Sequence, residues 1–257
     1  MRKSARWPVI LSLLAKDGDL DVMTLARDLA CSPATVRRDL RELDERNLLS
    51  RVHGGAVPNG ILHELPLRQR RTQQEEEKRC IAREAASRIE TGMVVGITGG
   101  TTTAALVRDL INRRLNDVTI VTNSLGLAHD LSLHTNYRLV VTGGFVRAAS
   151  LELVGPLPEY VMSKINLDLV FLGVDGIDVN HGLTIHNDLE ARTNELLAGR
   201  ARRVIVVADH TKVGRAVFAQ ICPLGVIDEL ITDDRATPEQ IEPIATAGLH
   251  VTRAALG

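Results

Sequence analysis

The chain has 257 residues, of which 44% are hydrophobic and 25% charged, and its formal net charge is -1. This is the composition of a globular protein long enough for two domains with separate cores, and it excludes a chain that binds nucleic acid through overall basicity alone. Only 2% of the residues are aromatic, which argues against binding by stacking bases on an aromatic platform.

Cysteine spacing and hydropathy limit the class further. Cys31, Cys80 and Cys222 are far apart and form no CxxC pair, so they predict reduced thiols and neither a disulfide framework nor a zinc site. No apolar run approaches the roughly 18 residues of a membrane span, and the start lacks an apolar segment of the signal-peptide type. We therefore expect a cytoplasmic protein that does not enter a membrane.

Two helices are predicted within the first 30 residues. Apolar residues recur at helical spacing in both segments, and the second segment is the shorter one. The first contains Val9, Ile10, Leu13 and Leu14, and the second contains Val22, Leu25, Ala26 and Leu29.

A third helix is predicted to begin at Ser32 and Pro33. The serine hydroxyl can accept a hydrogen bond from an early backbone N–H, and proline suits the first helical position, where an N–H would have no partner. Spacings of four and three place Val36, Leu40 and Leu43 on one face, which must pack against the rest of the domain.

The opposite face of this helix is suited to a DNA groove. Arg37, Arg38 and Arg41 point there, and the small Ala34 allows close approach. The arginine fork binds phosphate oxygens or guanine O6 and N7. The alternative is an ordinary solvated face, because acidic residues are interleaved with the arginines. These acidic residues are Asp39, Glu42, Asp44 and Glu45.

The order helix, helix, tight turn, helix favours a DNA-binding helix-turn-helix over a solvated face.

A hairpin is predicted directly after the third helix. Residues 48–51 and 56–57 flank Gly54 and Gly55, which tolerate positive φ and permit a tight turn. Arg51 and His53 lie on this wing, where they can contact phosphate or reach the neighbouring minor groove. The candidate DNA-binding residues are Ser32, Ala34, Thr35, Arg37, Arg38, Arg41, Arg51 and His53.

The segment TVRRDLRELDERNLLSRVHGGAV resembles the winged helix-turn-helix signature of the DeoR family of bacterial transcriptional regulators. The resemblance extends over nearly the whole chain, since the motifs that follow occur in that family's order. It implies that the amino-terminal domain binds double-stranded operator DNA. It also implies that the carboxy-terminal domain binds a sugar phosphate or a related metabolite.

Composition places the domain boundaries. Residues 58–74 contain proline, glycine and a basic cluster at 68–71, which is either solvated or in contact with the DNA backbone, and a helical pattern opens at Glu75. We predict a winged helix-turn-helix domain at 1–57, a linker at 58–74 and an effector domain at 75–257.

From Met93 onward, short β-branched runs alternate with helical segments. This alternation predicts an α/β, Rossmann-like domain with a mostly parallel sheet and helices on both sides. In such sheets, ligands bind beyond the carboxyl ends of the strands. The predicted strands are residues 94–98, 119–122, 139–142, 169–174, 204–208 and 229–232.

The turn TGGTTT lies where the first of these strands ends and a helix begins. Glycines let the backbone approach an anion, threonine hydroxyls donate to it, and the helix amino terminus adds about half a positive charge. The alternative is a tight turn without a ligand. Because the P-loop lysine and a full GxGxxG are missing, no nucleotide cofactor is predicted. The candidate phosphate-binding residues are Thr98, Gly99, Gly100, Thr101, Thr102 and Thr103.

Two further polar groups follow apolar runs. Asn123, in TNS, is the preferred ligand contact, and Gly143 and Gly144, in TGG, can line the same crevice, although turns alone would explain both groups.

Charged residues follow two later strands. Asp175 and Asp178, in GVDGID, are expected at the sugar end of a ligand, since carboxylates accept from hydroxyls and repel phosphate. Lys212, in ADHTKVG, can neutralise a phosphate or pair with Asp175. The alternative for Lys212 is a surface lysine.

These positions match the DeoR effector domain, which is similar to ribose-5-phosphate isomerase, so the resemblance also implies a rival function. An isomerase needs a general base and a group that stabilises an enediolate, which Asp175, Asp178, Glu190 and Lys212 can in principle supply. The DNA-binding domain and the family's usual loss of catalysis favour a protein that is not an enzyme.

The segment at residues 182–197 is expected to select the ligand through His186, Asn187 and Glu190. The spacing of His186 with His181 and His210 matches no standard metal site, so hydrogen-bonding or surface histidines are expected and no metal or cofactor is predicted.

We therefore predict a ligand-responsive repressor of a carbohydrate-metabolism operon. It is expected to act as a homo-oligomer, a dimer or tetramer, on a repeated or palindromic operator. A ligand can act only if it binds one arrangement of the DNA-binding domains more tightly than another. A purely architectural DNA binder would have no use for the strand-end glycines, threonines and lysine.

Overall fold

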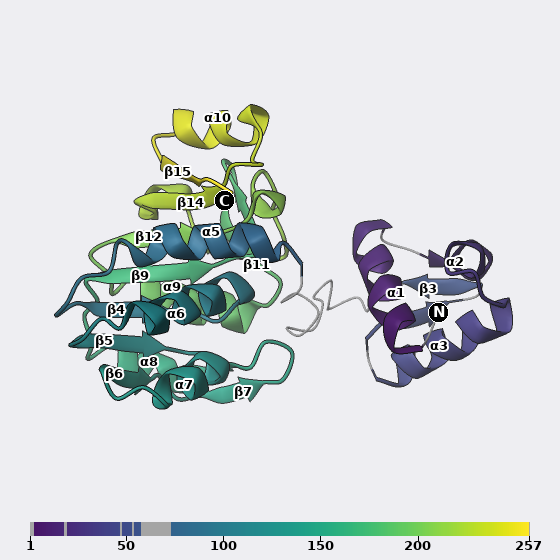
Figure 1. Cartoon of the computed structure of the whole chain (residues 1–257), viewed down its shortest axis with the longest axis horizontal. Helices are drawn as coiled ribbons and strands as arrows, with labels where there is room; N and C mark the ends of the chain where they lie inside the picture. Colours follow the sequence, from purple (N-terminus) through teal and green to yellow (C-terminus); the bar gives the residue numbers. More distant parts are fainter. Residues whose placement is uncertain (1–2, 18–19, 47, 53, 58–72, 257) are drawn as a thin grey trace. The chain divides into compact units, whose positions relative to one another are not determined.

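The computed structural model describes residues 3–17, 20–46, 48–52, 54–57 and 73–256. The chain divides into two compact units, Met1–Arg70 and Arg71–Gly257, which we call the amino-terminal and carboxy-terminal units (Figure 1). Among the described helices, none is long and apolar enough to cross a membrane.

The amino-terminal unit is a helical domain with a small sheet. The apolar positions that predicted its three helices form one core, in which Ile10, Leu25, Leu40 and Leu43 are fully buried. Each such burial stabilises the fold by roughly 1.5–3 kcal/mol. The elements are α1 (Lys3–Asp17), β1 (Leu20–Asp21), α2 (Val22–Asp28), α3 (Pro33–Glu45), β2 (Ser50–Val52) and β3 (Gly55–Val57).

The predicted wing is present, but its two glycines have different roles. Gly54 has a φ of 87° and lies in the turn, whereas Gly55 belongs to β3 and pairs with both β1 and β2. A Cβ on Gly55 would lie 2.0 Å from the carbonyl oxygen of Leu20. Gly55 therefore permits the close approach of β1, a strand too short to show an alternating pattern in the sequence.

The carboxy-terminal unit is built on a seven-stranded sheet of order β15-β14-β12-β9-β4-β5-β6. Every pairing in it is parallel, which confirms the predicted sheet. All six predicted strands are present with ends shifted by one or two residues, and β15 is an addition. The strands are β4 (Val94–Ile97), β5 (Val118–Thr122), β6 (Tyr137–Val141), β9 (Leu169–Gly173), β12 (Val204–Val207), β14 (Glu229–Asp233) and β15 (His250–Ala254).

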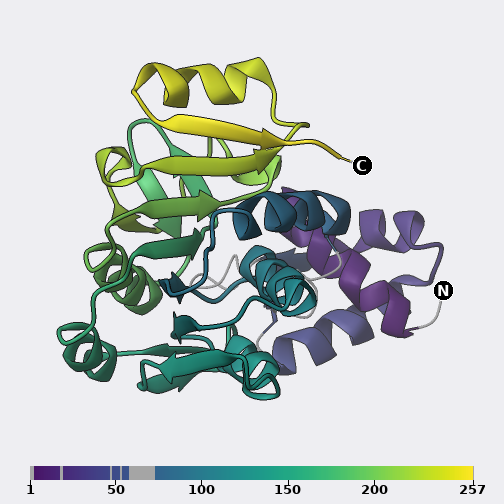
Figure 2. The ribbon, with the colours of Figure 1, turned by 60° about the vertical axis from the view of Figure 1, so that its left-hand side comes forward.

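Helices cover both faces of this sheet (Figures 1 and 2). Alternation along β9 explains why: Phe171 belongs to one buried cluster, while Val170 and Leu172 belong to the other. The first cluster includes α5 (Glu75–Ala86), α6 (Thr101–Arg113) and α7 (Leu125–Ser132). The second includes α8 (Pro156–Met162), α9 (Asp188–Ala198) and α10 (Pro238–Thr246).

Two smaller sheets were not predicted. One is a hairpin of two short strands, and the other has three strands in the order β10-β11-β13. They consist of β7 (Phe145–Arg147) and β8 (Glu152–Val154), and of β10 (Gly176–Asp178), β11 (Gly182–Ile185) and β13 (Ala219–Cys222), with the 3-10 turns η1 (His210–Lys212) and η2 (Leu224–Val226) nearby in sequence.

The three cysteines are free thiols. Cys80 and Cys222 are buried, and burial raises the pKa of both thiols to about 11.

Candidate functional site

The third helix of the amino-terminal unit begins as its sequence predicted. The Ser32 hydroxyl caps α3 by accepting from the backbone N–H of Thr35 at 3.2 Å, and Pro33 opens the helix. Ala34, Arg37, Arg38 and Arg41 are exposed, and Thr35 is half-buried.

One of the four interleaved carboxylates does not lie on the arginine face. Asp39 is fully buried and accepts from Arg6 Nε at 2.7 Å and from Trp7 Nε1 at 3.3 Å, so it ties α3 to α1. Glu42 forms an ion pair with Lys3. Two of the carboxylates that favoured a plain solvated face are thus engaged with α1, and the positive charge of the arginine face is less offset than the sequence suggests.

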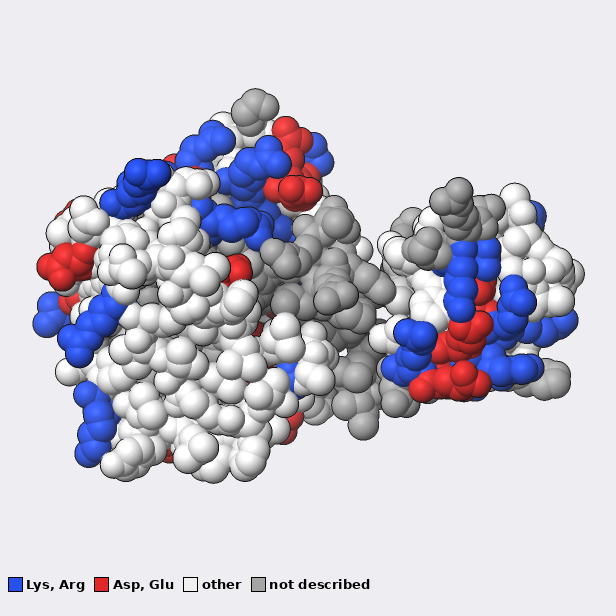
Figure 3. All heavy atoms as spheres, turned by 60° about the horizontal axis from the view of Figure 1, so that its bottom comes forward, with Lys and Arg blue, Asp and Glu red and all other residues white. Residues whose placement is uncertain are grey.

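The wing carries two of the candidate DNA-binding residues. Arg51 is exposed on β2, and His53 lies outside the described residues. On the face of the amino-terminal unit seen in Figure 3, Lys and Arg side chains lie beside Asp and Glu side chains.

In the carboxy-terminal unit, the strand order marks one candidate region for a ligand. The chain runs from β4 to β5 and β6 on one side, and β9, β12, β14 and β15 lie on the other. The order therefore reverses between β4 and β9, and open parallel sheets bind ligands beyond the carboxyl ends of the strands at such a point. We call this region the strand-end crevice; residues 98–103 follow β4, and residues 174–178 follow β9.

The turn after β4 packs closely against the end of β9. Thr98 is buried, and its hydroxyl accepts from the Gly173 N–H at 3.0 Å. Gly100 has a φ of 142°, and a Cβ on Gly173 would meet the Gly99 carbonyl oxygen at 3.0 Å. These glycines allow α6 to start at Thr101, beside the end of β9.

The threonines of this turn differ in exposure. Thr101 is half-buried, Thr102 is 8% exposed, and Thr103 is fully buried, with its hydroxyl donating to the Gly100 carbonyl at 3.1 Å. The first turn of α6 therefore presents backbone N–H groups and Thr101 and Thr102 as its candidates for an anion.

Asn123 is hydrogen-bonded to the start of this turn. It is fully buried, its Oδ1 accepts from the Gly99 N–H at 3.2 Å, and its Nδ2 donates to Glu152 at 2.8 Å. The polar atoms of Asn123, the preferred contact from the sequence, are thus bonded to protein groups in this structure.

Three predicted residues meet after β9. Asp175 Oδ2 lies 2.8 Å from Nδ1 of His186, and its Oδ1 lies 3.8 Å from Nζ of Lys212. Asp175 is 4% exposed, and the side chains of His186 and Lys212 are 9% and 23% exposed. Nε2 of His186 is buried without a hydrogen-bond partner. The pairing of Lys212 with Asp175 was one of the two roles expected for this lysine.

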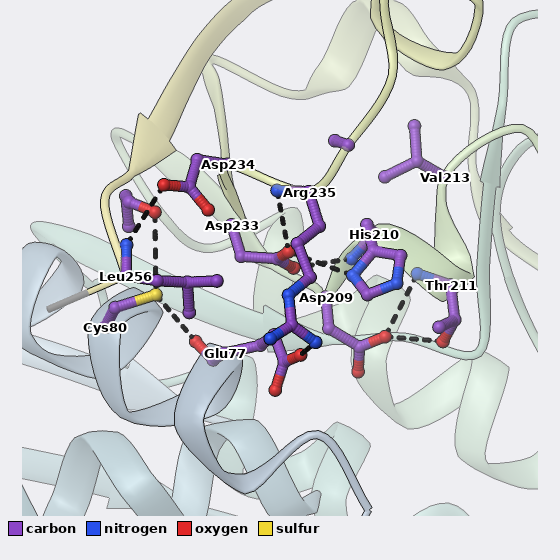
Figure 4. A network of polar contacts seen from close by, with 12 residues as sticks. Glu77, Cys80, Asp209, His210, Thr211, Val213, Asp233, Asp234, Arg235 and Leu256 are labelled. Atoms are coloured by element: carbon purple, nitrogen blue, oxygen red, sulfur yellow. Dashed lines mark hydrogen bonds and ion pairs between the residues drawn. The ribbon is translucent and has the colours of Figure 1, made fainter.

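Lys212 belongs to η1, whose start is held by a buried carboxylate (Figure 4). Asp233 accepts from the His210 N–H at 2.7 Å and lies 2.9 Å from His210 Nδ1. Arg235 donates its backbone N–H to Asp233 at 3.1 Å and forms an ion pair with Glu77 of α5. These bonds fix the start of η1 against the end of β14, and the ion pair ties the segment after β14 to α5.

Glu190 joins a buried cluster beside the crevice. Its carboxylate pairs with Arg147 Nη1 at 2.9 Å and accepts from Ser150, while the neighbouring Glu152 lies against Gly99. The β7–β8 hairpin supplies these partners. Asn187 caps α9 by accepting from the Glu190 N–H at 3.2 Å.

The remaining candidates lie elsewhere. Gly143 and Gly144 link β6 to β7 with positive φ, and Gly144 packs against the β8 backbone. Asp178 sits at the far end of the β10–β11 hairpin from Asp175, where it accepts from the N–H groups of Asn180 and His181. Although burial raises its pKa, hydrogen bonding by His181 lowers it, and the net pKa lies below the usual value. Within the described part of the chain, no three His, Cys, Asp or Glu side chains gather to hold a metal ion.

Comparison with known proteins identifies the family. The DeoR-like helix-turn-helix domain matches residues 6–60, and the DeoR C-terminal sensor domain matches residues 73–234. The chain belongs to the DeoR family. The predicted membership is thereby confirmed, and this DeoR-family protein is a transcriptional regulator with an amino-terminal DNA-binding domain.

Relatives of similar length support this assignment. The DeoR-family chain is 41% identical over 245 residues to the HTH-type transcriptional regulator GlpR of Haloferax volcanii, with 94% of each chain covered. It is 33% identical over 233 residues to the glycerol-3-phosphate regulon repressor of Escherichia coli, with 91% of this chain and 92% of the relative covered. It is 31% identical over 237 residues to the lactose phosphotransferase system repressor of Streptococcus mutans, with 91% and 93% covered.

Among solved structures, ribose 5-phosphate isomerase A of Methanocaldococcus jannaschii is similar to 57% of the DeoR-family chain and 56% of its own, with a TM-score of 0.41 and 18% identity.

Sequence reasoning missed the polar residues that the β7–β8 hairpin brings to the site, Arg147 and Glu152. Glu152 stands between apolar residues in LELV, and a carboxylate in such a run is a signal for a buried, paired charge. Asn194, fully buried on α9, accepts from Asn123 at 3.4 Å and also escaped notice.

Proposed function

We propose that this regulator represses an operon of carbohydrate metabolism and that a sugar phosphate in the strand-end crevice modulates its binding to operator DNA. The observation that carries the proposal is the switch point of the sheet. There the first turn of α6, the Asp175–Lys212 pair and His186 lie at neighbouring strand ends. The names of two relatives, a glycerol-3-phosphate regulon repressor and a lactose phosphotransferase system repressor, agree with this ligand class.

On the DNA side, we assign groove contact to α3. Its exposed arginines can donate to phosphate oxygens or to guanine, and Ala34 allows close approach. We propose that the protein acts in the cytoplasm as a homo-oligomer, a dimer or tetramer, because one such helix reads only a half-site and a symmetric pair reads two.

On the ligand side, we assign the phosphate to the first turn of α6 and to Lys212. Backbone N–H groups and an ammonium both favour an anion there. Asp175, His186 and Glu190 are assigned to the hydroxyl-bearing end, since carboxylates accept from hydroxyls.

The test uses the full-length protein and a duplex selected by it from a random pool. Fluorescence anisotropy measures DNA binding while sugar phosphates and the matching free sugars are added. We expect one sugar phosphate to change DNA affinity and its free sugar to have no effect. An equal response to the free sugar, or no response to any phosphorylated compound, would remove the sugar phosphate from the proposal.

Lys212→Met is expected to weaken sugar phosphate binding roughly tenfold to a hundredfold, since a charged hydrogen bond is worth about 1.5–3 kcal/mol. DNA affinity without ligand should stay the same. Isothermal titration calorimetry measures the first quantity and anisotropy the second. Lys164→Met, at an exposed lysine of the same unit, is the control. Unaltered ligand affinity in Lys212→Met would contradict the assignment.

We also propose that the bound sugar phosphate is not turned over, because the relatives are regulators. The residue types of the crevice are nevertheless those an isomerase uses. Proton exchange between a bound sugar phosphate and deuterated solvent, followed by NMR, tests this. Exchange that Glu190→Gln abolishes would show catalysis and overturn this part of the proposal.

A further inference from the structure

In the Asp175–His186 pair, one ring nitrogen of the histidine has no role in the proposed function. Asp175 directly precedes β10 and His186 directly follows β11, so both lie at the open end of the β10–β11 hairpin. Their contact joins Nδ1 of the ring to Oδ2 of the carboxylate at 2.8 Å. The other ring nitrogen, Nε2, is buried and has no hydrogen-bond partner.

The carboxylate determines which nitrogen of the ring carries hydrogen. An ionised carboxylate only accepts, so Nδ1 must be the donor in this contact. In the neutral imidazole, Nε2 then keeps its lone pair and is an acceptor. Leaving such an atom buried and unpaired is unfavourable, so the site favours a ligand that donates a hydrogen bond at this point.

We propose, resting on the proposed function, that Asp175 and His186 read a free hydroxyl of the sugar phosphate and reject a carbonyl in its place. A hydroxyl can donate to Nε2, whereas a carbonyl oxygen would place a second lone pair against it. The effector class is therefore a phosphorylated polyol or the alcohol form of a sugar, and the ketone of the same chain length binds more weakly.

The location agrees with this role. Asp175 lies two residues beyond Gly173, which packs against the Gly99–Gly100 turn at the start of α6. On its other side, Asp175 faces Lys212. A ligand whose phosphate occupies that turn would thus have its carbon chain near the pair.

The first experiment reads the tautomer directly. Full-length protein carrying ¹⁵N-labelled histidine is measured by long-range ¹H–¹⁵N NMR, and His186→Phe identifies the signal. We expect hydrogen on Nδ1 and none on Nε2 in the unmodified protein. Hydrogen on Nε2 alone would overturn the inference, whatever the ligand.

Asp175→Asn tests the cause. Lys212 faces Oδ1, so the amide oxygen of the variant should turn toward the lysine and its NH₂ toward the ring. The ring must then accept at Nδ1 and carry hydrogen on Nε2, the change of tautomer known from the same substitution in serine proteases. Lys212→Met keeps the Asp175–His186 contact and should keep the original tautomer.

The second experiment compares alcohol and ketone partners by calorimetry. The probes are glycerol 3-phosphate with dihydroxyacetone phosphate, and sorbitol 6-phosphate with fructose 6-phosphate. For the pair that binds, the unmodified protein should prefer the alcohol at least about tenfold. Asp175→Asn should bring this ratio to one or below, and His186→Phe should bring it near one. Lys212→Met should weaken both partners and leave the ratio unchanged.

The outcomes separate the two claims. Equal affinity for alcohol and ketone in the unmodified protein, or an unchanged ratio in His186→Phe, would overturn the inference and leave sugar phosphate binding intact. If no phosphorylated compound binds at all, the proposed function fails and the hydroxyl-reading role fails with it, although the tautomer result still stands. His186→Phe also covers the case in which Asp175→Asn does not fold.

Discussion

Asp39→Ala is expected to lower the free energy of unfolding of the amino-terminal unit by about 3–5 kcal/mol. The substitution removes a fully buried carboxylate and leaves Arg6, whose side chain is 8% exposed, without that counter-charge. Breaking a buried ion pair from one side costs more than the pair contributes, because the remaining charge has lost its water as well as its partner.

Trp7 makes this prediction measurable in the full-length protein. It is the single tryptophan of the chain, it lies in α1, and its Nε1 donates to Asp39 itself. Urea unfolding followed by Trp7 fluorescence therefore reports the amino-terminal unit. Glu45→Ala, an exposed carboxylate of the same helix, should shift the transition by no more than about 0.5 kcal/mol. A transition in Asp39→Ala that coincides with that of the unmodified protein would show that the buried pair does not hold α1 against α3.

Replacing Arg37, Arg38 and Arg41 together with alanine is expected to weaken operator binding at least about a hundredfold. Each arginine that contacts a base or phosphate contributes roughly 1–3 kcal/mol, and all three are exposed on one face of α3. Anisotropy at several salt concentrations gives the affinity and its salt dependence. Each lost phosphate contact should also reduce the slope of log K against log salt by about 0.9.

Single variants then assign the arginines. A base-reading arginine should lower affinity mainly for the selected sequence, and a phosphate-binding arginine should lower it for every sequence. Arg202→Ala, at an exposed arginine of the carboxy-terminal unit, is the control and should leave DNA affinity unchanged. The triple variant should keep its urea transition and its response to sugar phosphate. DNA affinity retained in the triple variant would contradict the assignment of α3 as the groove-binding helix.

Local features of this chain were predictable because their causes are local. The Ser32–Pro33 start of α3 depends on one side chain and one turn of backbone. The six strands were found because a sheet buried on both faces needs continuous β-branched runs, such as Val204–Val207. Strands that are short or half-exposed, such as those of the β7–β8 hairpin, carry no such run and were missed.

The candidate site was only partly predictable. Residues that come soon after strands of the large sheet, such as Thr98, Asp175 and Lys212, were found because parallel strand ends meet at one edge of a sheet. The partners of other site residues were not found: Glu152, which bonds to Asn123, and Arg147, which pairs with Glu190, come from the missed hairpin. In the amino-terminal unit, Asp39 was grouped with the solvated charges although it is buried against Arg6. A polar side chain's partner depends on distant segments, which spacing along one segment does not reveal.

The two-part organisation, the capped arginine helix, the parallel sheet and the family could be predicted because caps, periodicity and short motifs depend on residues close together in the chain. Which polar groups remain available depends on how distant segments pack. In the folded protein Asn123 is bonded to the turn after β4, Asp233 is bonded to η1, and Nε2 of His186 is buried without a partner. Whether a buried polar atom finds a hydrogen-bond partner depends on strands and loops that are far apart in the chain and meet only in the fold.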